Sequence, residues 1–369
     1  MDMAARRVGV LRERDAGERR VALTPETVPR VRALGLEVVV EAGAGAGAWH
    51  ADSAYRESGA DILGAAEFAG VSDILVCVGP PDPAILRPGS IVIGLLEPER
   101  NGGLIAAYAE RHVTAMSLDR LPRTLSRAQS MDALTSQAAI AGYKAAVLAA
   151  DTFGGYFPML MTAAGTVKPA TVLVLGTGVA GLAAIGAARR IGAVVTGYDI
   201  RPEAAAEVRS LGARFLDLGT TPRGSGAGGY ARALSADERA GQQAALQDRV
   251  AAFDIVITTA RVPGRTPPVL VTADAVKAMR PGSVVIDAAC GPGGGNVEGS
   301  VADRTLVTAG GVTVIGAANL PSAMAPAASA AYARNITAVL DHLVRGTTPT
   351  LDPEDEILAA LVVSAPEKD

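Results

Sequence analysis

Cysteine, histidine and aromatic residues are all scarce in this chain of 369 residues. It contains two cysteines and three histidines, and aromatic residues make up only 4% of it. Cys77 and Cys290 lie far apart and outside any Cys-x-x-Cys spacing, which argues against a disulfide framework and against a zinc site. We therefore predict no metal centre and two buried cysteines in a reducing compartment.

Long apolar runs and excess positive charge are also missing. No uninterrupted apolar run approaches the roughly 20 residues that span a bilayer, and the first residues have no apolar core typical of a signal peptide. The formal net charge is −4 without a polybasic stretch, which argues against nucleic acid as a partner. We expect a cytoplasmic chain without direct membrane insertion, so that any membrane step needs another chain.

The abundant residues are small and apolar, and they form short apolar segments that alternate with helical patterns. Examples in the first third are residues 37–43, 73–79 and 90–96, and a second series starts at Thr171. Strands that are apolar on both faces and alternate with helices predict a buried parallel sheet. The length favours two such α/β domains. The stretch from residue 122 begins as a polar loop and becomes a long Ala-rich helix from about Met131.

One glycine motif has the context of a dinucleotide-binding turn. Gly176, Gly178 and Gly181 form G-x-G-x-x-G directly after the strand TVLVL and open a helix, and Asp199 ends the next strand. In this motif the glycines permit a tight turn, close approach of a pyrophosphate and close helix–strand packing. A carboxylate at Asp199 favours NAD(H) over NADP(H), and we expect it to dominate over the nearby Arg201.

Two other glycine-rich segments are weaker candidates. Residues 43–47 follow a strand, but the next strand ends without an acidic residue, so we interpret them as a structural loop. Residues 290–296 follow the strand SVVIDAA, at the edge where open α/β sheets bind ligands. This second segment either walls a nicotinamide pocket or is a plain connecting loop, and both interpretations remain open.

Acid–base residues are missing where a dehydrogenase would place them. His50, His112 and His342 do not stand at strand ends, and no histidine or lysine lies near the ends of the strands at 74–78 and 91–96. A hydroxy-acid or amino-acid dehydrogenase moves a proton together with the hydride and needs such a group. Direct hydride transfer between two nicotinamides needs only positioning of the two rings.

Several longer segments resemble a known family. The segments PRTLSRAQSMDALTSQAAIAGYKA, PMLMTAAGTVKPATVLVLGTGVAGL, GGYARAL and ITTARVPG look like the NAD(H)-binding alpha component of proton-translocating transhydrogenase. The segment ERRVALTP is similar both to that family and to alanine dehydrogenase. The resemblance covers nearly the whole chain, and SRAQSMD is among its most specific parts.

The resemblance implies a fold, a reaction and partners. It implies two Rossmann-like, doubly wound parallel-sheet domains with a nucleotide cleft between them, residues 1–132 plus 326–369 and residues 133–325. NADH would give its hydride to NADP⁺ that is bound on a separate, NADP(H)-binding partner subunit. A membrane-spanning subunit would couple this transfer to proton movement. The chain would be a homodimer that is peripheral to the cytoplasmic membrane through its partner subunits.

The resemblance also assigns site residues. It implies catalytic roles for Arg123, Gln129 and Asp132, although one inserted residue leaves Arg127 as a second match to the family's arginine. The implied cofactor-binding residues are Arg127, Ser130, Met131, Ser136, Gly176, Gly178, Val179, Gly181, Asp199, Ile200, Arg201, Gly229, Tyr230, Gln242, Thr259, Ala260 and Arg261.

Two of these assignments carry particular expectations. Tyr230 matches the tyrosine of a mobile loop, about residues 219–236, that closes over the nucleotide; the alternative for this glycine-rich segment is plain disorder. Arg261 stands where the family has an aliphatic residue near the adenine, which would alter adenine packing.

The sequence leaves two alternatives to the transhydrogenase function. In an amino-acid dehydrogenase of the alanine dehydrogenase type, Arg20 would bind the substrate carboxylate, but the missing lysine and histidine argue against that function. In a non-catalytic NAD(H)-binding subunit, the intact SRAQSMD segment would have no purpose. Turnover with pyruvate and ammonium, or with an NADP component, separates the three.

Overall fold

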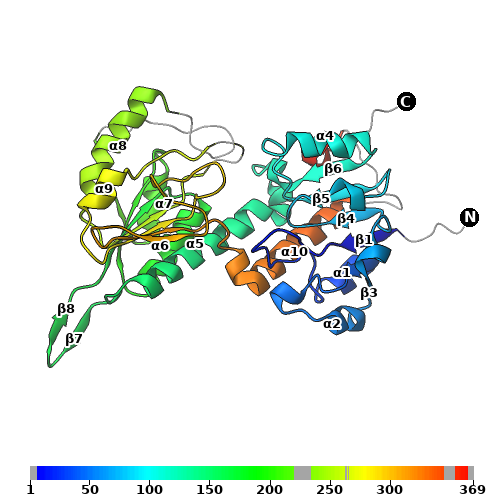
Figure 1. Cartoon of the computed structure of the whole chain (residues 1–369), viewed down its shortest axis with the longest axis horizontal. Helices are drawn as coiled ribbons and strands as arrows, with labels where there is room; N and C mark the ends of the chain where they lie inside the picture. Colours follow the sequence, from blue (N-terminus) through cyan, green and yellow to red (C-terminus); the bar gives the residue numbers. More distant parts are fainter. Residues whose placement is uncertain (1–5, 220–233, 262–263, 265, 345–353, 365–369) are drawn as a thin grey trace, which may run out of the picture. The chain divides into compact units, whose positions relative to one another are not determined.

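The computed structural model describes residues 6–219, 234–261, 264, 266–344 and 354–364. Contacts divide the chain into two compact units. Unit 1 comprises Met1–Gln137 and Pro321–Asp369, and unit 2 comprises Ala138–Leu320. Each unit has a seven-stranded sheet with helices against it, which confirms the predicted α/β class with two Rossmann-like sheets (Figure 1).

The sheet of unit 1 has the strand order β16-β6-β5-β4-β1-β2-β3. All neighbours are parallel except the edge pair β16–β6. Leaving out β16, the order in space is that of a doubly wound dinucleotide fold, with the switch point between β1 and β4. The strands are β1 Arg7–Val10, β2 Glu37–Glu41, β3 Asp61–Leu63, β4 Ile74–Val76, β5 Ile91–Gly94, β6 Thr114–Ser117 and β16 Val362–Ser364.

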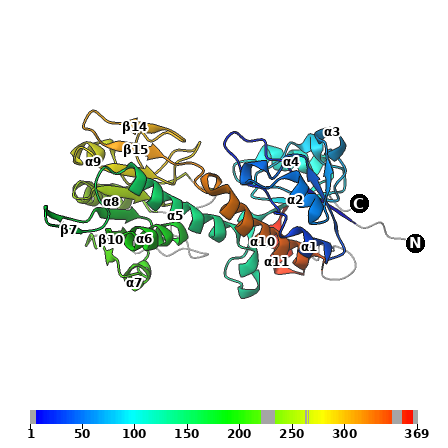
Figure 2. The same ribbon diagram turned by 90° about the horizontal axis from the view of Figure 1, so that it is seen from below.

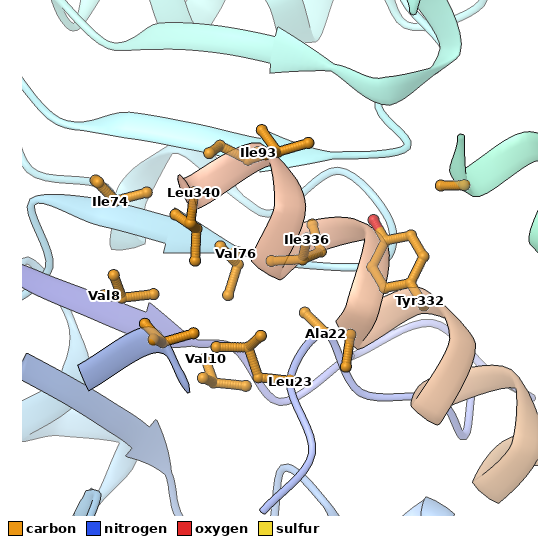
Figure 3. Close-up of a cluster of buried hydrophobic side chains, with 14 of the residues drawn as sticks. Val8, Val10, Ala22, Leu23, Ile74, Val76, Ile93, Tyr332, Ile336 and Leu340 are labelled. Carbon is orange, nitrogen blue, oxygen red and sulfur yellow. The ribbon is translucent and has the colours of Figure 1, made fainter. Parts of the chain in front are cut away.

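Helix α10 fills one face of this sheet. Tyr332, Ile336 and Leu340 are spaced four residues apart, so they lie on one side of the helix and are fully buried. They pack toward strand residues such as Val76 and Ile93 (Figure 3). A second cluster covers the other face and includes residues of α3 and α4. The helices are α1 Val28–Arg32, α2 Asp52–Glu57, α3 Ala65–Phe68, α4 Gly102–Glu110, α10 Ala325–Leu343 and α11 Glu356–Leu361.

The sheet of unit 2 repeats this topology, with the order β11-β10-β9-β12-β13-β15-β14. Only the edge pair β14–β15 is antiparallel. The switch point lies between β9 and β12, where a doubly wound fold binds its ligand. The strands are β9 Thr171–Leu175, β10 Val194–Tyr198, β11 Arg214–Phe215, β12 Ile255–Thr258, β13 Val284–Asp287, β14 Thr305–Val307 and β15 Thr313–Gly316.

Helices cover both faces of the second sheet (Figure 2). Residues of α5, α6 and α7 bury one face, and residues of α8 and α9 bury the other. Small residues allow close packing, since a Cβ at Gly142 in α5 would lie 1.9 Å from the Ala180 oxygen in α6. The helices are α5 Ala133–Thr152, α6 Val179–Arg190, α7 Ala204–Ser210, α8 Ala236–Val250 and α9 Ala273–Ala278.

Two local features differ from the sequence-based expectation. The start of the SRAQSMD segment, expected to be loop, forms the 3-10 helix η4 Ser126–Met131. A two-stranded hairpin, β7 Leu160–Thr162 and β8 Gly165–Val167, was not expected at all and projects from unit 2 (Figure 1). Its strands were not recognised because their side chains are mostly exposed and leave no buried-face pattern.

The residues that the structure describes contain neither a candidate membrane span nor a candidate metal site. No helix among them combines the length and apolar character needed to cross a bilayer. In the same ranges, no three His, Cys, Asp or Glu side chains converge in a way that could hold a metal ion.

Candidate functional site

The turn between β9 and α6 needs glycine at two positions for reasons internal to the chain. Gly176 has φ +87°, a left-handed conformation that side chains rarely adopt, and a Cβ there would lie 2.8 Å from the Ala260 nitrogen. A Cβ at Gly181 would lie 1.9 Å from the Gly176 oxygen. These two glycines therefore allow the start of α6 to press against the turn.

Gly178 is different, because none of the residues that the structure describes requires glycine there. Its φ is −71°, it is exposed, and a Cβ at this position would meet no atom within 4 Å. Gly178 is also the N-cap of α6, and no side chain caps the helix whose first residue is Val179. An open surface at an uncapped helix N-terminus is a suitable place for a pyrophosphate, since backbone N–H groups and the helix dipole both attract anions.

Asp199, at the end of β10, is tied into the same turn. Its Oδ2 accepts hydrogen bonds from Thr177 N at 2.8 Å and Thr177 Oγ1 at 3.3 Å. Its Oδ1 accepts from Arg201 N at 2.9 Å and Arg201 Nε at 3.1 Å. The carboxylate of Asp199, predicted to bind the ribose, thus lies beside the glycine turn but is paired with Arg201. Ile200, between these two residues in the sequence, is half-buried.

The end of β12 closes the other side of the turn. Thr259 Oγ1 donates to the Gly176 oxygen at 2.8 Å, and Ala260 N donates to Asn296 Oδ1 at 2.9 Å. The buried Asn296 also donates through Nδ2 to the oxygens of Ala260 at 3.0 Å and Pro268 at 2.7 Å. Arg261 is exposed next to this clamp. The segment Thr259, Ala260 and Arg261 therefore lies beside the glycine turn between β9 and α6.

The glycine-rich loop after β13 is ordered around one buried carboxylate. Asp287 Oδ1 accepts from Thr258 Oγ1 at 3.0 Å, and its Oδ2 accepts from Val297 N at 3.1 Å and Ser300 Oγ at 2.6 Å. The Ala289 and Asn296 nitrogens also donate to Oδ1. Asn296 connects this loop directly to the segment after β12. The loop therefore helps to hold the residues beside the glycine turn between β9 and α6.

The other predicted cofactor residues of unit 2 divide into two groups. Gln242, in α8, is buried and donates to Tyr198 Oη at 3.0 Å, so in this structure it braces the end of β10. Gly229 and Tyr230, with most of the predicted loop at 219–236, lie outside the described residues.

In unit 1, the SRAQSMD segment carries a compact charged cluster. Asp132 Oδ2 accepts from Arg123 Nε at 3.0 Å and from Thr135 Oγ1 at 2.6 Å. Asp132 Oδ1 accepts from Thr135 N at 2.8 Å at the start of α5, and Arg123 Nη2 donates to Thr135 Oγ1 at 2.8 Å. Arg123 and Asp132 are thus brought together across the one-residue insertion.

The second candidate arginine has another partner. Arg127 Nη2 lies 2.5 Å from Glu356 Oε1, and both side chains are largely exposed, 56% and 60%. Gln129 and Ser130 are exposed, whereas Met131 is buried. In this structure only Arg123 of the two arginines contacts Asp132.

Helix α10 holds the segment in place. Asn335 Nδ2 donates to the Ser130 oxygen at 2.8 Å, and Ser136 Oγ donates to Asn335 Oδ1 at 2.7 Å. The exposed Gln129 is therefore followed directly by residues that side-chain hydrogen bonds hold in place, at Ser130 and at Asp132.

A buried ionic cluster in unit 1 was not found from the sequence. Glu13 Oε1 accepts from Val78 N at 2.6 Å, and its Oε2 accepts from Gly79 N at 3.2 Å, beyond the end of β4. Burial raises the pKa of Glu13 to about 7, and the nearby Glu18 adds to the shift while the two backbone bonds and Arg20 oppose it. Acidic residues are common on surfaces, so nothing in the sequence marked this one as buried.

Arg20 belongs to the same cluster. Its Nε and Nη2 donate to both carboxylate oxygens of Glu18, at 2.8 and 2.6 Å, and its Nη1 donates to Gln137 Oε1 at 2.9 Å. Bidentate pairing of this kind is a strong form of ion pair. The guanidinium that an amino-acid dehydrogenase would use for a substrate carboxylate is here engaged by the chain's own carboxylate.

The glycine segment at residues 43–47 packs closely against its neighbours. A Cβ at Gly45 would lie 2.7 Å from Tyr55, and one at Gly47 would lie 2.6 Å from the Arg19 oxygen. The loop therefore needs glycine for packing against its neighbours and leaves no open space for a ligand at these positions.

Two family models cover almost the whole chain. The model described as "Alanine dehydrogenase/PNT, N-terminal domain" matches residues 9–141, and that described as "Alanine dehydrogenase/PNT, C-terminal domain" matches residues 145–368. The chain belongs to the alanine dehydrogenase/PNT family.

Within the alanine dehydrogenase/PNT family, similarity is greater to transhydrogenase subunits. The chain is 41% identical to NAD(P) transhydrogenase subunit alpha of Cereibacter sphaeroides, over 97% of this chain and 70% of that one. It is 38% identical to NAD(P) transhydrogenase subunit alpha of Haemophilus influenzae, over 98% and 74%. Alanine dehydrogenase of Bacillus subtilis is 29% identical, over 89% and 83%.

Solved structures of the alanine dehydrogenase/PNT family agree. A transhydrogenase from Sinorhizobium meliloti matches with a TM-score of 0.86 and 39% identity, over 97% of this chain and 98% of that one. An L-alanine dehydrogenase matches with a TM-score of 0.80 and 26% identity, over 97% and 95%. The chain is therefore homologous to transhydrogenase alpha subunits over nearly its full length, and the family resemblance inferred from the sequence is confirmed.

Proposed function

We propose that this chain is the NAD(H)-binding component of a proton-translocating transhydrogenase, in which NADH gives its hydride directly to NADP⁺ on a partner subunit. The observation that carries the proposal is the β9–α6 turn, where an uncapped helix N-terminus, the open surface at Gly178 and the carboxylate of Asp199 occur together. The identity to transhydrogenase alpha subunits, about ten percentage points above that to an alanine dehydrogenase, supports the choice of reaction.

The residues of unit 2 suit the adenosine and pyrophosphate parts of NADH. The N-terminus of α6 would bind the pyrophosphate at Gly178 and Val179, and Asp199 would accept hydrogen bonds from the ribose hydroxyls. The surrounding wall would come from Ile200, Thr259, Ala260 and Arg261, with Gln242 as a brace behind Tyr198. Gly229 and Tyr230 would belong to a loop that closes over the bound nucleotide.

The residues of unit 1 suit the nicotinamide part. Bound NADH supplies the hydride, which moves with its electron pair and leaves no proton for the protein to transfer. Asp132, held by Arg123 and Thr135, would present an ordered acceptor to the nicotinamide ribose or carboxamide, with Ser136 one turn further on. Gln129 would lie between the two nucleotides at the docking face, flanked by Arg127, Ser130 and Met131.

The lack of acid–base residues fits this reaction. The sequence has no lysine before Lys144, and the residues after β4 and β5 include no histidine up to Pro98. An alanine dehydrogenase must bind a carboxylate and move protons. Arg20, the residue for the first task, is already paired with Glu18.

We propose that the chain is a homodimer that docks with NADP(H)-binding and membrane-spanning subunits at the cytoplasmic membrane. The β7–β8 hairpin supports the dimer, because Met161 is 77% exposed and Met159 57% exposed, and large apolar side chains on a projecting hairpin are typical of contact surfaces. Met161→Glu should raise the dimer dissociation constant, as measured by light scattering over a dilution series, whereas Lys277→Glu on the exposed surface of α9 should not.

The deciding experiment mixes the purified chain with the NADP(H)-binding component of a related transhydrogenase, NADH and thio-NADP⁺. We expect reduction of the thionicotinamide to require both proteins. Asp132→Asn should lower the rate on the order of tenfold or more, since the variant keeps an acceptor for Thr135 N but loses the charge that holds Arg123. Asp274→Asn, which alters an exposed carboxylate of α9, is the matched control and should have the wild-type rate.

Two outcomes would contradict the proposal. Turnover of pyruvate and ammonium with NADH would identify an amino-acid dehydrogenase. NADH binding without reduction of thio-NADP⁺, even with several partner components, would leave a non-catalytic NAD(H)-binding subunit.

A further inference from the structure

The ion pair between Asp199 and Arg201 lies within the proposed nucleotide site and goes beyond what a ribose-binding carboxylate requires. Besides its bonds from Arg201 N and Nε, Asp199 receives one at Oδ2 from Arg201 Nη2 at 3.1 Å. The same Nη2 donates to the Thr177 oxygen at 3.1 Å, in the middle of the glycine turn. The side chains of Arg201 and Asp199 are only 11% and 8% exposed, so the guanidinium is enclosed against the turn.

The carboxylate of Asp199 is saturated in this arrangement. It accepts two hydrogen bonds from Thr177 and three from Arg201, whereas the two oxygens of a carboxylate offer about four lone-pair sites. A ribose hydroxyl that binds Asp199 therefore competes with these donors, three of which belong to Arg201. Asp199 thus interacts with two alternative partners, the ribose and the guanidinium.

Arg201 is chemically equipped for another ligand. A guanidinium stays charged at all ordinary pH values and presents a planar set of donors that matches phosphate oxygens. Near the second strand of a dinucleotide-binding fold, an arginine is the residue that accommodates the 2′-phosphate of NADP(H). Although burial by itself lowers the pKa of Arg201, the hydrogen bond and charge of Asp199 raise it overall. Glu207 is a more distant partner at 3.9 Å.

We propose that Asp199 and Arg201 form a selectivity latch, in which the carboxylate sequesters a guanidinium that would otherwise bind the 2′-phosphate of NADP(H). Discrimination between NADH and NADP(H) then has two sources. Asp199 repels the 2′-phosphate, and Arg201, which would bind the 2′-phosphate, is kept occupied. The proposal rests on the proposed function, because it assumes nucleotide binding at the β9–α6 turn. A chain that works beside an NADP(H)-binding partner benefits directly, since the latch keeps the two nucleotides on separate proteins.

The latch makes a different prediction from simple charge repulsion. If repulsion alone excludes the 2′-phosphate, removing Asp199 should help NADPH whether or not Arg201 is present. If sequestration matters, the gain should require Arg201. A comparison of Asp199→Ser, Arg201→Gln and the double variant separates the two explanations.

The experiment measures dissociation constants of NADH and NADPH for each full-length variant by titration of nicotinamide fluorescence. We expect the wild type to prefer NADH, and Asp199→Ser to bind NADPH on the order of 10- to 100-fold more tightly than the wild type, as a charge-assisted hydrogen bond allows. The double variant should lose most of this gain. Arg201→Gln alone should retain the preference for NADH, and Arg209→Gln, on the exposed side of α7, is the matched arginine control and should behave as wild type.

Folding is checked by thermal unfolding, and Asp199→Asn is the second variant, because its amide oxygen still accepts from Thr177 N. The gain should also weaken steeply with salt, as a phosphate contact does. A double variant that binds NADPH as tightly as Asp199→Ser would overturn the latch in favour of repulsion. Folded Asp199 variants that bind NADH but gain nothing for NADPH would overturn it as well, whereas a wild type that binds neither nucleotide would refute the proposed function itself.

Discussion

The parallel strands of the two units are arranged in the same order, but the connection after the first of these strands differs between the units. In unit 2, β9 is followed by a three-residue glycine turn and then by the twelve-residue helix α6. In unit 1, β1 is followed by residues 11–27 and then by α1, which has five residues and contains Pro29. The long connection carries Glu13, Glu18 and Arg20, which form a buried ionic cluster.

This difference shows that the topology alone does not make a binding site. At the switch point of unit 2 the chain leaves an uncapped helix N-terminus and open space. At the switch point of unit 1 the carboxyl group of Glu13 accepts hydrogen bonds from Val78 N and Gly79 N, so a side chain of the chain itself occupies these two donors. A shared fold therefore indicates where a ligand can lie, and side chains decide whether it does.

The largest expected effect comes from the glycines of unit 2, which separate folding from binding. Gly181→Ala should lower the free energy of unfolding by about 1–3 kcal/mol, because its Cβ would overlap the Gly176 oxygen. Gly178→Ala should leave stability nearly unchanged and weaken NADH binding on the order of tenfold, because its Cβ meets only the space left for the ligand. Thermal unfolding measures the stability of each variant, and titration measures its NADH binding. Equal losses of stability in the two variants would contradict the different roles of Gly178 and Gly181.

An effect of at most similar size is expected from Glu13 in unit 1. Burial raises its pKa to about 7 in the folded chain, so between pH 4.5 and 7 the folded state holds a proton that the unfolded state has lost. The free energy of unfolding should therefore fall as pH rises through this window, by up to about 3 kcal/mol.

Glu13→Gln should remove this pH dependence, because glutamine keeps an acceptor for Val78 N and does not titrate. Denaturant unfolding at pH 5 and pH 7.5 gives the comparison. Parallel curves for the wild type and the variant would show that Glu13 has an ordinary pKa in the folded chain.

The smallest effect is expected at Arg127. Its ion pair with Glu356 is exposed on both sides, so Arg127→Ala should change stability by less than about 1 kcal/mol. A loss of hydride transfer by this variant would then be attributable to the nucleotide site. Unchanged transfer would leave Arg123 as the arginine that serves Asp132.

Much of the fold was predictable because it depends on patterns that are local in sequence. Buried parallel strands are apolar on both faces, and the Ala-rich helix expected from about Met131 corresponds to α5, Ala133–Thr152. The glycine motif was predictable because it directly follows the apolar strand TVLVL and opens a helix, although the steric reason for glycine at position 176 is Ala260, far along the chain.

The features that were missed depend on tertiary contacts or on very short elements. Strands β7 and β8 have three residues each, too few for a periodic signal. The environment of Glu13 depends on Val78 and Gly79, just after β4 and more than sixty residues further along the chain. The pairing of Asp199 with Arg201 is visible as a spacing, but the saturation of the carboxylate depends on Thr177, 22 residues away.

The Asp287 carboxylate has a consequence for the cost of ligand binding. Because Asp287 belongs to the interior strand β13 and receives five hydrogen bonds, the glycine-rich loop after that strand becomes ordered when the sheet itself forms. A nucleotide that binds at this edge does not have to freeze the loop, so less of its interaction energy is offset by lost backbone entropy. Amide hydrogens of Asn296 and Val297 should accordingly exchange slowly, as those of the sheet do.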